Sequence, residues 1–242
     1  MDIKTKIRSL VQQAVEAYIR EQTIDQPKPA IAVLLGYQSP NPSEVLEAVA
    51  RLQDNYDVTL ILKKEWVPLA TTSAYLVLEE SNYQELQEVV AKSSLLVFPV
   101  ASYQLLSKLA LSMDDDLTVW VAIQHQLLGK PIVIANDHIE PSVYQQIHAP
   151  HSVLERLGSY IRQIQLDQVK WVSLTKLITT IDEQINTYYE KRPLILAKHI
   201  EKAHQDGLKE IDVSMKSKIT PSAKDLAKDL SIEIKKYSQE GG

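Results

Sequence analysis

Residues 95–137 of the chain are LLVFPVASYQLLSKLALSMDDDLTVWVAIQHQLLGKPIVIAND. The stretch opens with an unbroken apolar run, Leu95–Pro99, and closes with a second one, Pro131–Ala135. Runs of this kind are typical of strands that are covered on both faces of a parallel sheet. The spacing of apolar residues between the two runs predicts helices at Leu105–Leu111 and Leu117–Leu128. The stretch therefore predicts two parallel strands joined by a helical crossover.

The same alternation of strand and helix continues on both sides of this stretch. Repeated units of this type predict the α/β class, with a doubly wound parallel sheet over residues 30–193. Upstream, the pattern predicts strands at Ala30–Leu35, Val58–Leu62 and Tyr75–Leu78, with helices at Ser43–Asn55 and Tyr83–Ala91. Downstream, residues 141–191 are mostly helical, with a short strand at Lys170–Val172.

A separate amphipathic helix is predicted ahead of this domain, at residues 1–22. Its apolar residues recur at helical spacing and form one stripe. Residues 23–29 contain two prolines and predict a linker. A lone helix of this length is marginal in water, so the stripe needs a partner surface. That surface could belong to the same domain, to another copy of the chain, or to another protein.

Residues 194–242 predict a small carboxyl-terminal α/β module. It has a helix at Ile195–Gln205, a strand at Glu210–Val213, a second helix at Ser222–Leu230 and a last strand at Ile232–Ile234. Thr220 is expected to cap the second helix, with Pro221 at its first position, where the missing N–H costs nothing.

The composition excludes several classes of function. The chain has 242 residues and a net charge of −5, so no overall positive field attracts nucleic acid or anionic lipid. Cysteine is absent, which excludes disulfides, thiolate metal sites and cysteine nucleophiles. There is no long apolar run and no secretory leader, so we expect a cytoplasmic protein. The histidines lack the spacing of metal ligands, and Asp114–Asp116 is explained by favourable charge at a helix start.

Ligands of doubly wound sheets lie beyond the carboxyl ends of the strands. Two loops qualify here, Gly36–Ser43 and Pro99–Ser102. The hydroxyls of Ser39 and Ser43, together with the following helix, could bind a phosphate. The simpler alternative is that Ser43 caps that helix.

Residues 30–140 resemble the flavoprotein family that contains phosphopantothenoylcysteine decarboxylase. In that family a strand ends in proline, and a loop with a hydroxyl, a lysine, an aspartate and a leucine follows before the next strand. Ser102, Lys108, Asp115 and Leu117 occupy those positions here, and Gln104 replaces the family's asparagine. The resemblance implies FMN binding through Gly36, Ser39, Ser102 and Lys108. Lys108 could equally be a solvated helix lysine.

Departures from the family argue against decarboxylation. The family's decarboxylases use a histidine in the amino-terminal half of the domain and a cysteine. This chain has no histidine before His125 and no cysteine. The family's Gly-Ser pair after the first strand is Gly36-Tyr37, and its glycine after the lysine is Ser112. We therefore lean towards a protein that is not an enzyme.

The carboxyl-terminal module resembles that of propanediol- and ethanolamine-utilisation proteins of bacterial microcompartments. Val119–Leu128 is similar to a segment of the PduM type. The resemblance implies an accessory or structural protein of such a compartment, which binds shell or lumen proteins through residues 1–22 and forms homo-oligomers. An FMN-binding enzyme of the same pathway is the alternative, and the module could instead be a stabilising cap. The matching residues are Gly207, Lys209, Ile211, Val213, Ile219, Thr220, Pro221, Ala223, Asp225 and Ala227.

Overall fold

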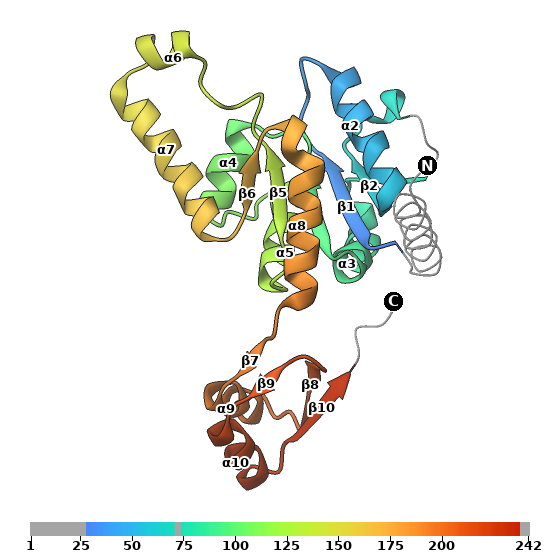
Figure 1. The fold of residues 1–242 in the computed structure, drawn as a ribbon, viewed down its shortest axis with the longest axis vertical. Helices are drawn as coiled ribbons and strands as arrows, with labels where there is room; N and C mark the ends of the chain where they lie inside the picture. Colours follow the sequence, from blue (N-terminus) through green and yellow to red (C-terminus); the bar gives the residue numbers. More distant parts are fainter. Residues whose placement is uncertain (1–27, 71–73, 238–242) are drawn as a thin grey trace, which may run out of the picture.

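A computed structural model describes residues 28–70 and 74–237 (Figure 1). The helix predicted at residues 1–22 and most of the linker predicted at residues 23–29 lie outside these ranges. Within them, no helix has both the length and the apolar character needed to cross a membrane.

The centre of the molecule is a sheet of six parallel strands, in the order β3-β2-β1-β4-β5-β6. The chain builds outward from β1 in one direction, then returns to the centre and builds outward from β4 in the other. This order confirms the predicted doubly wound α/β fold and places its switch point between β1 and β4. The strands are β1 (Ala30–Leu35), β2 (Asp57–Leu62), β3 (Tyr75–Val77), β4 (Leu95–Phe98), β5 (Ile132–Ala135) and β6 (Lys170–Val172).

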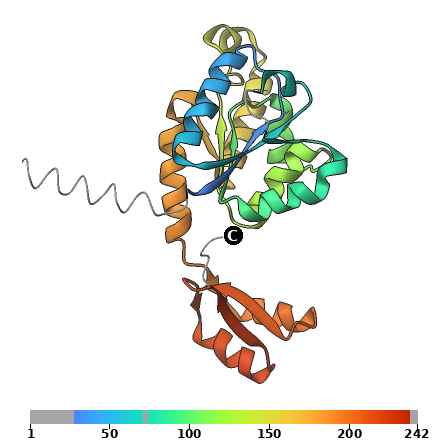
Figure 2. The ribbon, with the colours of Figure 1, turned by 90° about the vertical axis from the view of Figure 1, so that its right-hand side faces the viewer.

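Helices cover both faces of the sheet and create two separate apolar cores (Figures 1 and 2). Successive side chains of a strand point to opposite faces. In β1, Ala32 and Leu34 therefore enter one core, whereas Ile31, Val33 and Leu35 enter the other. The first core is closed by α3 (Tyr83–Lys92), α4 (Tyr103–Ala110), α5 (Leu117–Leu127) and α7 (His151–Leu166). The second is closed by α2 (Pro42–Asn55) and α8 (Leu177–Glu190).

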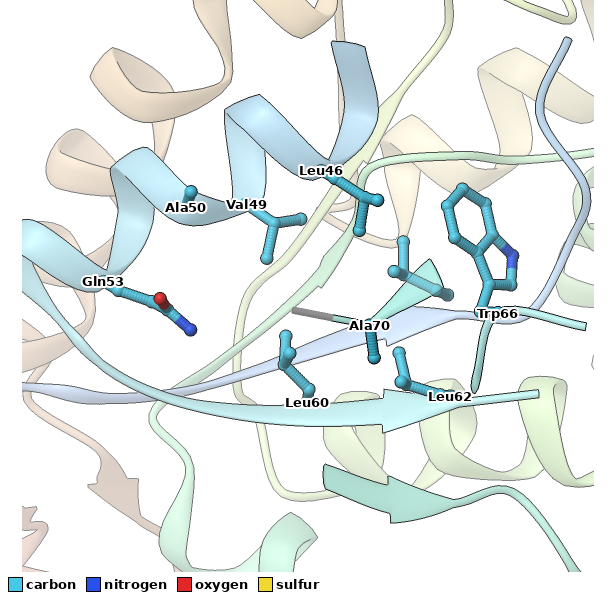
Figure 3. Close-up of a pocket in the computed structure, with 9 residues that line it drawn as sticks. Leu46, Val49, Ala50, Gln53, Leu60, Leu62, Trp66 and Ala70 are labelled. Atoms are coloured by element: carbon cyan, nitrogen blue, oxygen red, sulfur yellow. The ribbon is translucent and has the colours of Figure 1, made fainter. Parts of the chain in front are cut away.

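The contact between α2 and the sheet leaves only a small gap. Figure 3 shows apolar side chains of α2, among them Leu46 and Val49, facing Leu60, Leu62 and Trp66. The cavity between them measures about 20 Å³, enough for a single water molecule. The second core is therefore closely packed, and this gap is not a site for an organic ligand.

His125 of α5 is completely buried in the main domain. Its Nδ1 lies 2.9 Å from the Val121 carbonyl oxygen, and its Nε2 lies 2.9 Å from the hydroxyl of Ser93, the residue that ends α3. Nδ1–H donates to the Val121 carbonyl oxygen, whereas the single proton of the Ser93 hydroxyl is shared between His125 Nε2 and the Val89 carbonyl oxygen, which lies 2.7 Å from that hydroxyl. Burial lowers the pKa of His125 to about 4.

The carboxyl-terminal module consists of two strand–helix–strand segments with the same order of elements. Each strand pairs with the corresponding strand of the other segment. Ile195 pairs with Ile219, and Ile211 pairs with Ile234, both in parallel. Two helices, α9 (Ala197–Gln205) and α10 (Pro221–Asp229), pack over a small core of their own. The Thr220 hydroxyl accepts from the Ala223 amide, so the predicted cap is present. The strands are β7 (Leu194–Ile195), β8 (Glu210–Ser214), β9 (Lys218–Ile219) and β10 (Glu233–Tyr237).

His125 makes folding stability sensitive to acid. Its pKa is about 4 in the folded chain, against a reference value of 6.5. Between these pH values the unfolded chain binds the extra proton, so stability is complete above about pH 6.5 and falls towards pH 4. The difference at pH 4 is about 3 kcal/mol.

We predict that His125→Leu reduces the loss of unfolding free energy between pH 7 and pH 4 by about this amount, measured by urea unfolding at each pH. His151→Leu, at an exposed histidine, serves as the control and should leave the loss unchanged. An equal loss in both variants would contradict the assignment.

Candidate functional site

The switch point of the sheet brings together the two loops that the sequence singled out. The chain leaves β1 at Gly36 towards α2 on one face, and it leaves β4 at Pro99 towards α4 on the other face. Two loops that diverge in this way leave a crevice at the carboxyl edge of a sheet. The first turn of α5 is the third part of this region, because Thr118 lies against Gly36.

Gly36 is required here by close packing. A Cβ atom at this position would lie 2.8 Å from Thr118 Cγ2 and 2.9 Å from Leu34 Cδ2. Both Gly36 and Thr118 are buried. The space beside the Gly36 backbone is therefore filled by the Thr118 side chain.

Ser102 and Lys108 already have partners within the protein. The Ser102 hydroxyl accepts a hydrogen bond of 3.2 Å from the Leu105 amide and so caps α4. Lys108 Nζ lies 2.8 Å from Asp115 Oδ1 and 2.9 Å from Asp116 Oδ2. The Lys108 side chain is only 17% exposed. It is therefore a paired lysine and not a solvated one.

Asp116 connects this ion pair to α5. One carboxylate oxygen accepts from Lys108, and the other accepts from the Val119 amide as the cap of the helix. Burial by itself would raise the pKa of Asp116, but the Lys108 and Val119 hydrogen bonds and the Lys108 charge outweigh it and hold this pKa below its ordinary value. In the same way, hydrogen bonds to Asp115 and then Asp116 raise the pKa of Lys108. Asp116 therefore provides the favourable negative charge that the sequence predicted at the start of this helix.

Tyr37 lies close to Ser102, Lys108, Asp116 and Thr118. The sequence marks it only as a departure from the family's Gly-Ser pair, with no role of its own. Burial, followed by the charge of Asp116, raises the pKa of Tyr37 to about 12, while the nearby Ser102 and Thr118 hydroxyls and the Lys108 charge oppose the rise. Among the described residues, neither Tyr37 Oη nor Thr118 Oγ1 has a hydrogen-bond partner, although both atoms are buried. The two hydroxyls lie near each other and near Ser102 without a hydrogen bond of ordinary geometry in the described part of the chain, and Tyr37 stays protonated at neutral pH.

Ser39 is held by a different part of the chain. Its hydroxyl accepts from the Asn41 amide at 3.0 Å and lies 3.1 Å from His138 Nε2, in the loop that follows β5. Since the hydroxyl accepts from Asn41, it is free to donate to His138. The alternative that Ser43 caps α2 is wrong, because the cap is Asn41, whose side chain makes no capping bond.

The structure therefore gathers Gly36, Ser102 and Lys108 around Tyr37, and it ties Ser39 to His138. Two features bear on whether a flavin phosphate fits. The hydroxyls of Tyr37 and Thr118 are unsatisfied donors of the kind that a phosphate would use. In contrast, the charge of Lys108 is balanced by two aspartates. In the described part of the chain, no cluster of three or more histidine or acidic residues could hold a metal ion.

Comparisons with known proteins agree with the fold. No protein-family model matches the chain, and no curated protein matches it. Apo DmrB of Burkholderia xenovorans, described as a cubic protein cage for redox transfer, is similar, with a TM-score of 0.50 and 15% identity, covering 67% of this chain and 98% of that one. The FMN-dependent cysteine decarboxylase SpaF has a TM-score of 0.49 and 16% identity, covering 68% and 98%.

A PPC decarboxylase variant has a TM-score of 0.46 and 13% identity, covering 65% of this chain and 96% of that one. At such identities the likeness to DmrB shows the fold alone. The main domain thus shares with DmrB a doubly wound parallel α/β fold.

The tight contact at Gly36 leads to a prediction about stability. Gly36→Ala should destabilise the fold by about 1–3 kcal/mol, because its Cβ overlaps Thr118 Cγ2. Thr118→Ser removes that methyl group, so the double variant should recover part of the loss in a double-mutant cycle.

Gly158→Ala is the matched control. Gly158 lies inside α7, where a Cβ would meet only the flexible end of Arg162 at 3.4 Å. We expect a gain of about 0.5–1 kcal/mol there. Chemical unfolding of the four variants measures these values, and a Gly36→Ala chain as stable as the parent would refute the packing argument.

Proposed function

We propose that this chain is an accessory protein of a propanediol- or ethanolamine-utilisation microcompartment, and that it binds shell or enzyme partners instead of catalysing a reaction. The proposal that the chain does not catalyse a reaction rests on one observation: the candidate site residues of the crevice are already in contact with other groups of the protein. Gly36 is closed off by Thr118, Ser102 caps α4, and Lys108 is bound to Asp115 and Asp116. A group that is fully engaged with its neighbours is poorly placed to act on a substrate.

The link to a microcompartment comes from the sequence of the carboxyl-terminal module. The resemblance lies in the strand around Ile211 and Val213 and in the helix that Thr220 and Pro221 open, and these residues occupy β8 and the start of α10. The amphipathic stripe predicted at residues 1–22 would provide the docking surface, since burial of apolar area drives such contacts.

Self-association belongs to the same proposal. The short helix α6 (Val143–His148) is well formed, with a complete capping box, yet its apolar side chains are uncovered. Val143, Tyr144 and Ile147 are 74%, 70% and 70% exposed. Exposed apolar groups gathered on one helix are typical of contact surfaces between proteins. Sedimentation of the purified chain would show whether it forms oligomers.

The docking proposal predicts where the chain accumulates in cells. A fluorescent fusion produced together with shell proteins should form foci at the compartments, and a chain lacking residues 1–22 should be diffuse. Leu10→Asp places a charge on the predicted stripe and should have the same effect, because a desolvated charge opposes docking. Gln13→Asp, on the opposite side of the predicted helix, is the matched control and should keep the foci. Foci that survive both the deletion and Leu10→Asp would exclude this role for the segment.

A flavoprotein that binds FMN is the second candidate, and one observation favours it. Tyr37 Oη and Thr118 Oγ1 are buried at the switch point of the sheet, with no hydrogen-bond partner in residues 28–70 and 74–237. A phosphate placed there would satisfy both hydroxyls, with Gly36, Ser39, Ser102 and Lys108 as the other residues of the site. Because Thr118 fills the space at Gly36 and Lys108 is paired, this binding requires α5 to move away from β1.

An FMN titration tests this second candidate. If FMN binds at the crevice, its fluorescence should change saturably with added protein, and Thr118→Val should weaken binding about tenfold, because it removes a hydroxyl without changing the shape of the side chain. Thr175→Val, at an exposed position, should have no effect. A purified chain that is colourless and leaves FMN fluorescence unchanged would rule out the flavin reading and leave the accessory role standing.

A further inference from the structure

A second cavity lies at the opposite edge of the sheet, beyond the amino ends of β5 and β6. It measures about 170 Å³, is open to solvent on one side, and is lined by the end of α5, the α5–β5 loop, the α7–β6 loop and the last turns of α8. Figure 1 shows these three segments meeting at the end of the main domain that adjoins the carboxyl-terminal module. A cavity of this volume can hold a small organic molecule. None of the residues predicted from the sequence as a site belongs to it.

One buried donor in the wall of the cavity is unsatisfied. The side-chain nitrogen Nε2 of Gln126 is inaccessible to solvent and has no hydrogen-bond partner among the described residues. A buried amide without a partner costs about 1–3 kcal/mol. The wall therefore contains a hydrogen-bond donor that lacks an acceptor among the described residues, and a ligand in the cavity can reach this donor only after the Gln126 side chain turns towards it.

Two lysines in the wall are held by carbonyl oxygens and not by carboxylates of the described residues. Lys130 Nζ donates to the Val90 and Ala91 carbonyl oxygens at 2.5 and 2.7 Å, and Lys191 Nζ approaches the Gly129 carbonyl oxygen at 3.4 Å. In the described part of the chain, neither lysine makes an ion pair. Burial lowers the pKa of Lys130 to about 8, which agrees with the lack of a negative partner.

The balance of charge indicates which ligand would fit. The wall holds two lysines and one acidic residue, Asp167, so one positive charge is left over. The carboxyl-terminal ends of α5, α7 and α8 also face this region, and their partial negative charge disfavours a dianion such as phosphate more strongly than a monoanion. A neutral ligand would leave the lysines uncompensated. A carboxylate carries a single charge and two acceptor oxygens, which can take bonds from Gln126 and from a lysine.

We propose that this cavity is a binding site for a small carboxylate monoanion, held by Gln126, Lys130 and Lys191. The site is independent of the crevice and of residues 1–22, so it goes beyond the function proposed above. Lys191 follows α8 directly and precedes β7, and Lys216 of the module donates to the Tyr189 carbonyl oxygen. A carboxylate bound between Lys130 and Lys191 would therefore tie the end of α8, where the module begins, to the α5–β5 loop.

Nuclear magnetic resonance of the full chain tests the proposal, with sodium acetate and sodium lactate as the probes. Saturable shifts are expected at the Gly129 and Gln168 backbone amides and at the Gln126 side-chain amide. Sodium phosphate and sodium chloride at equal ionic strength should give weaker, non-saturating changes. Stronger binding of phosphate than of either carboxylate, or an absence of saturable shifts with both carboxylates, would overturn the proposal.

Variants separate a specific site from general charge attraction. Gln126→Leu and Lys191→Met should each weaken carboxylate binding about tenfold, since each removes one bond to the ligand. Gln165→Leu and Lys170→Met, at exposed positions outside the cavity wall, are the matched controls and should bind like the parent chain. Lys130→Met can be added if it folds, but the result does not depend on it. Equal binding by Gln126→Leu, Lys191→Met and the two controls would refute the assignment.

Discussion

The complete burial of β1 between two parallel neighbours is the constraint on which the rest of the structure depends. Each residue from Ile31 to Leu35 is 0% exposed. Because no water reaches the strand, its backbone groups must pair with β2 on one side and β4 on the other, and both ladders are present. Because its side chains alternate between the two faces of the sheet, the strand contributes residues to both cores. Removal of this strand would separate the halves of the sheet and uncover both cores.

The crevice follows from the same arrangement, but its contents depend on α5. The loops after β1 and β4 diverge to opposite faces, which opens a space at their ends. Lys108 holds the acidic turn before α5, and Asp116 caps that helix. The helix is thereby anchored with Thr118 against Gly36. The lysine that resemblance associated with a flavin thus has a positioning role in this chain, because it places the residue that closes the crevice.

Much of the fold could be predicted from the sequence, because its strands are long apolar runs with turn residues at their ends. Once both faces of the sheet are buried, the strands Ala30–Leu35 and Leu95–Phe98 have little freedom to pair in another register. The strands β7 and β9 were not predicted, since two residues are too few to establish a period.

The site was harder to predict than the fold, because its contacts join distant parts of the chain. Ser39 and His138 are 99 residues apart, and no local pattern relates them. Tyr37 and Thr118 look like ordinary residues of a loop and a helix start. Their role arises only when the sheet brings β1 next to α5. The pairing of Lys108 with Asp116 is closer in sequence, and the charge pattern could have revealed it.

The two edges of the sheet differ in how their polar groups are satisfied, and this difference suggests where ligand binding is retained. At the carboxyl edge, the cation Lys108 is balanced by two aspartates, and the Tyr37 and Thr118 hydroxyls lack partners among the described residues. At the amino edge, Lys130 and Lys191 bond to carbonyl oxygens, and the Gln126 side-chain nitrogen has no acceptor within the same described ranges. An unbalanced charge near a cavity is more costly than an unsatisfied hydroxyl, so a ligand gains more by binding there. The main domain therefore has its stronger unbalanced charge at the amino edge of the sheet, away from the switch point.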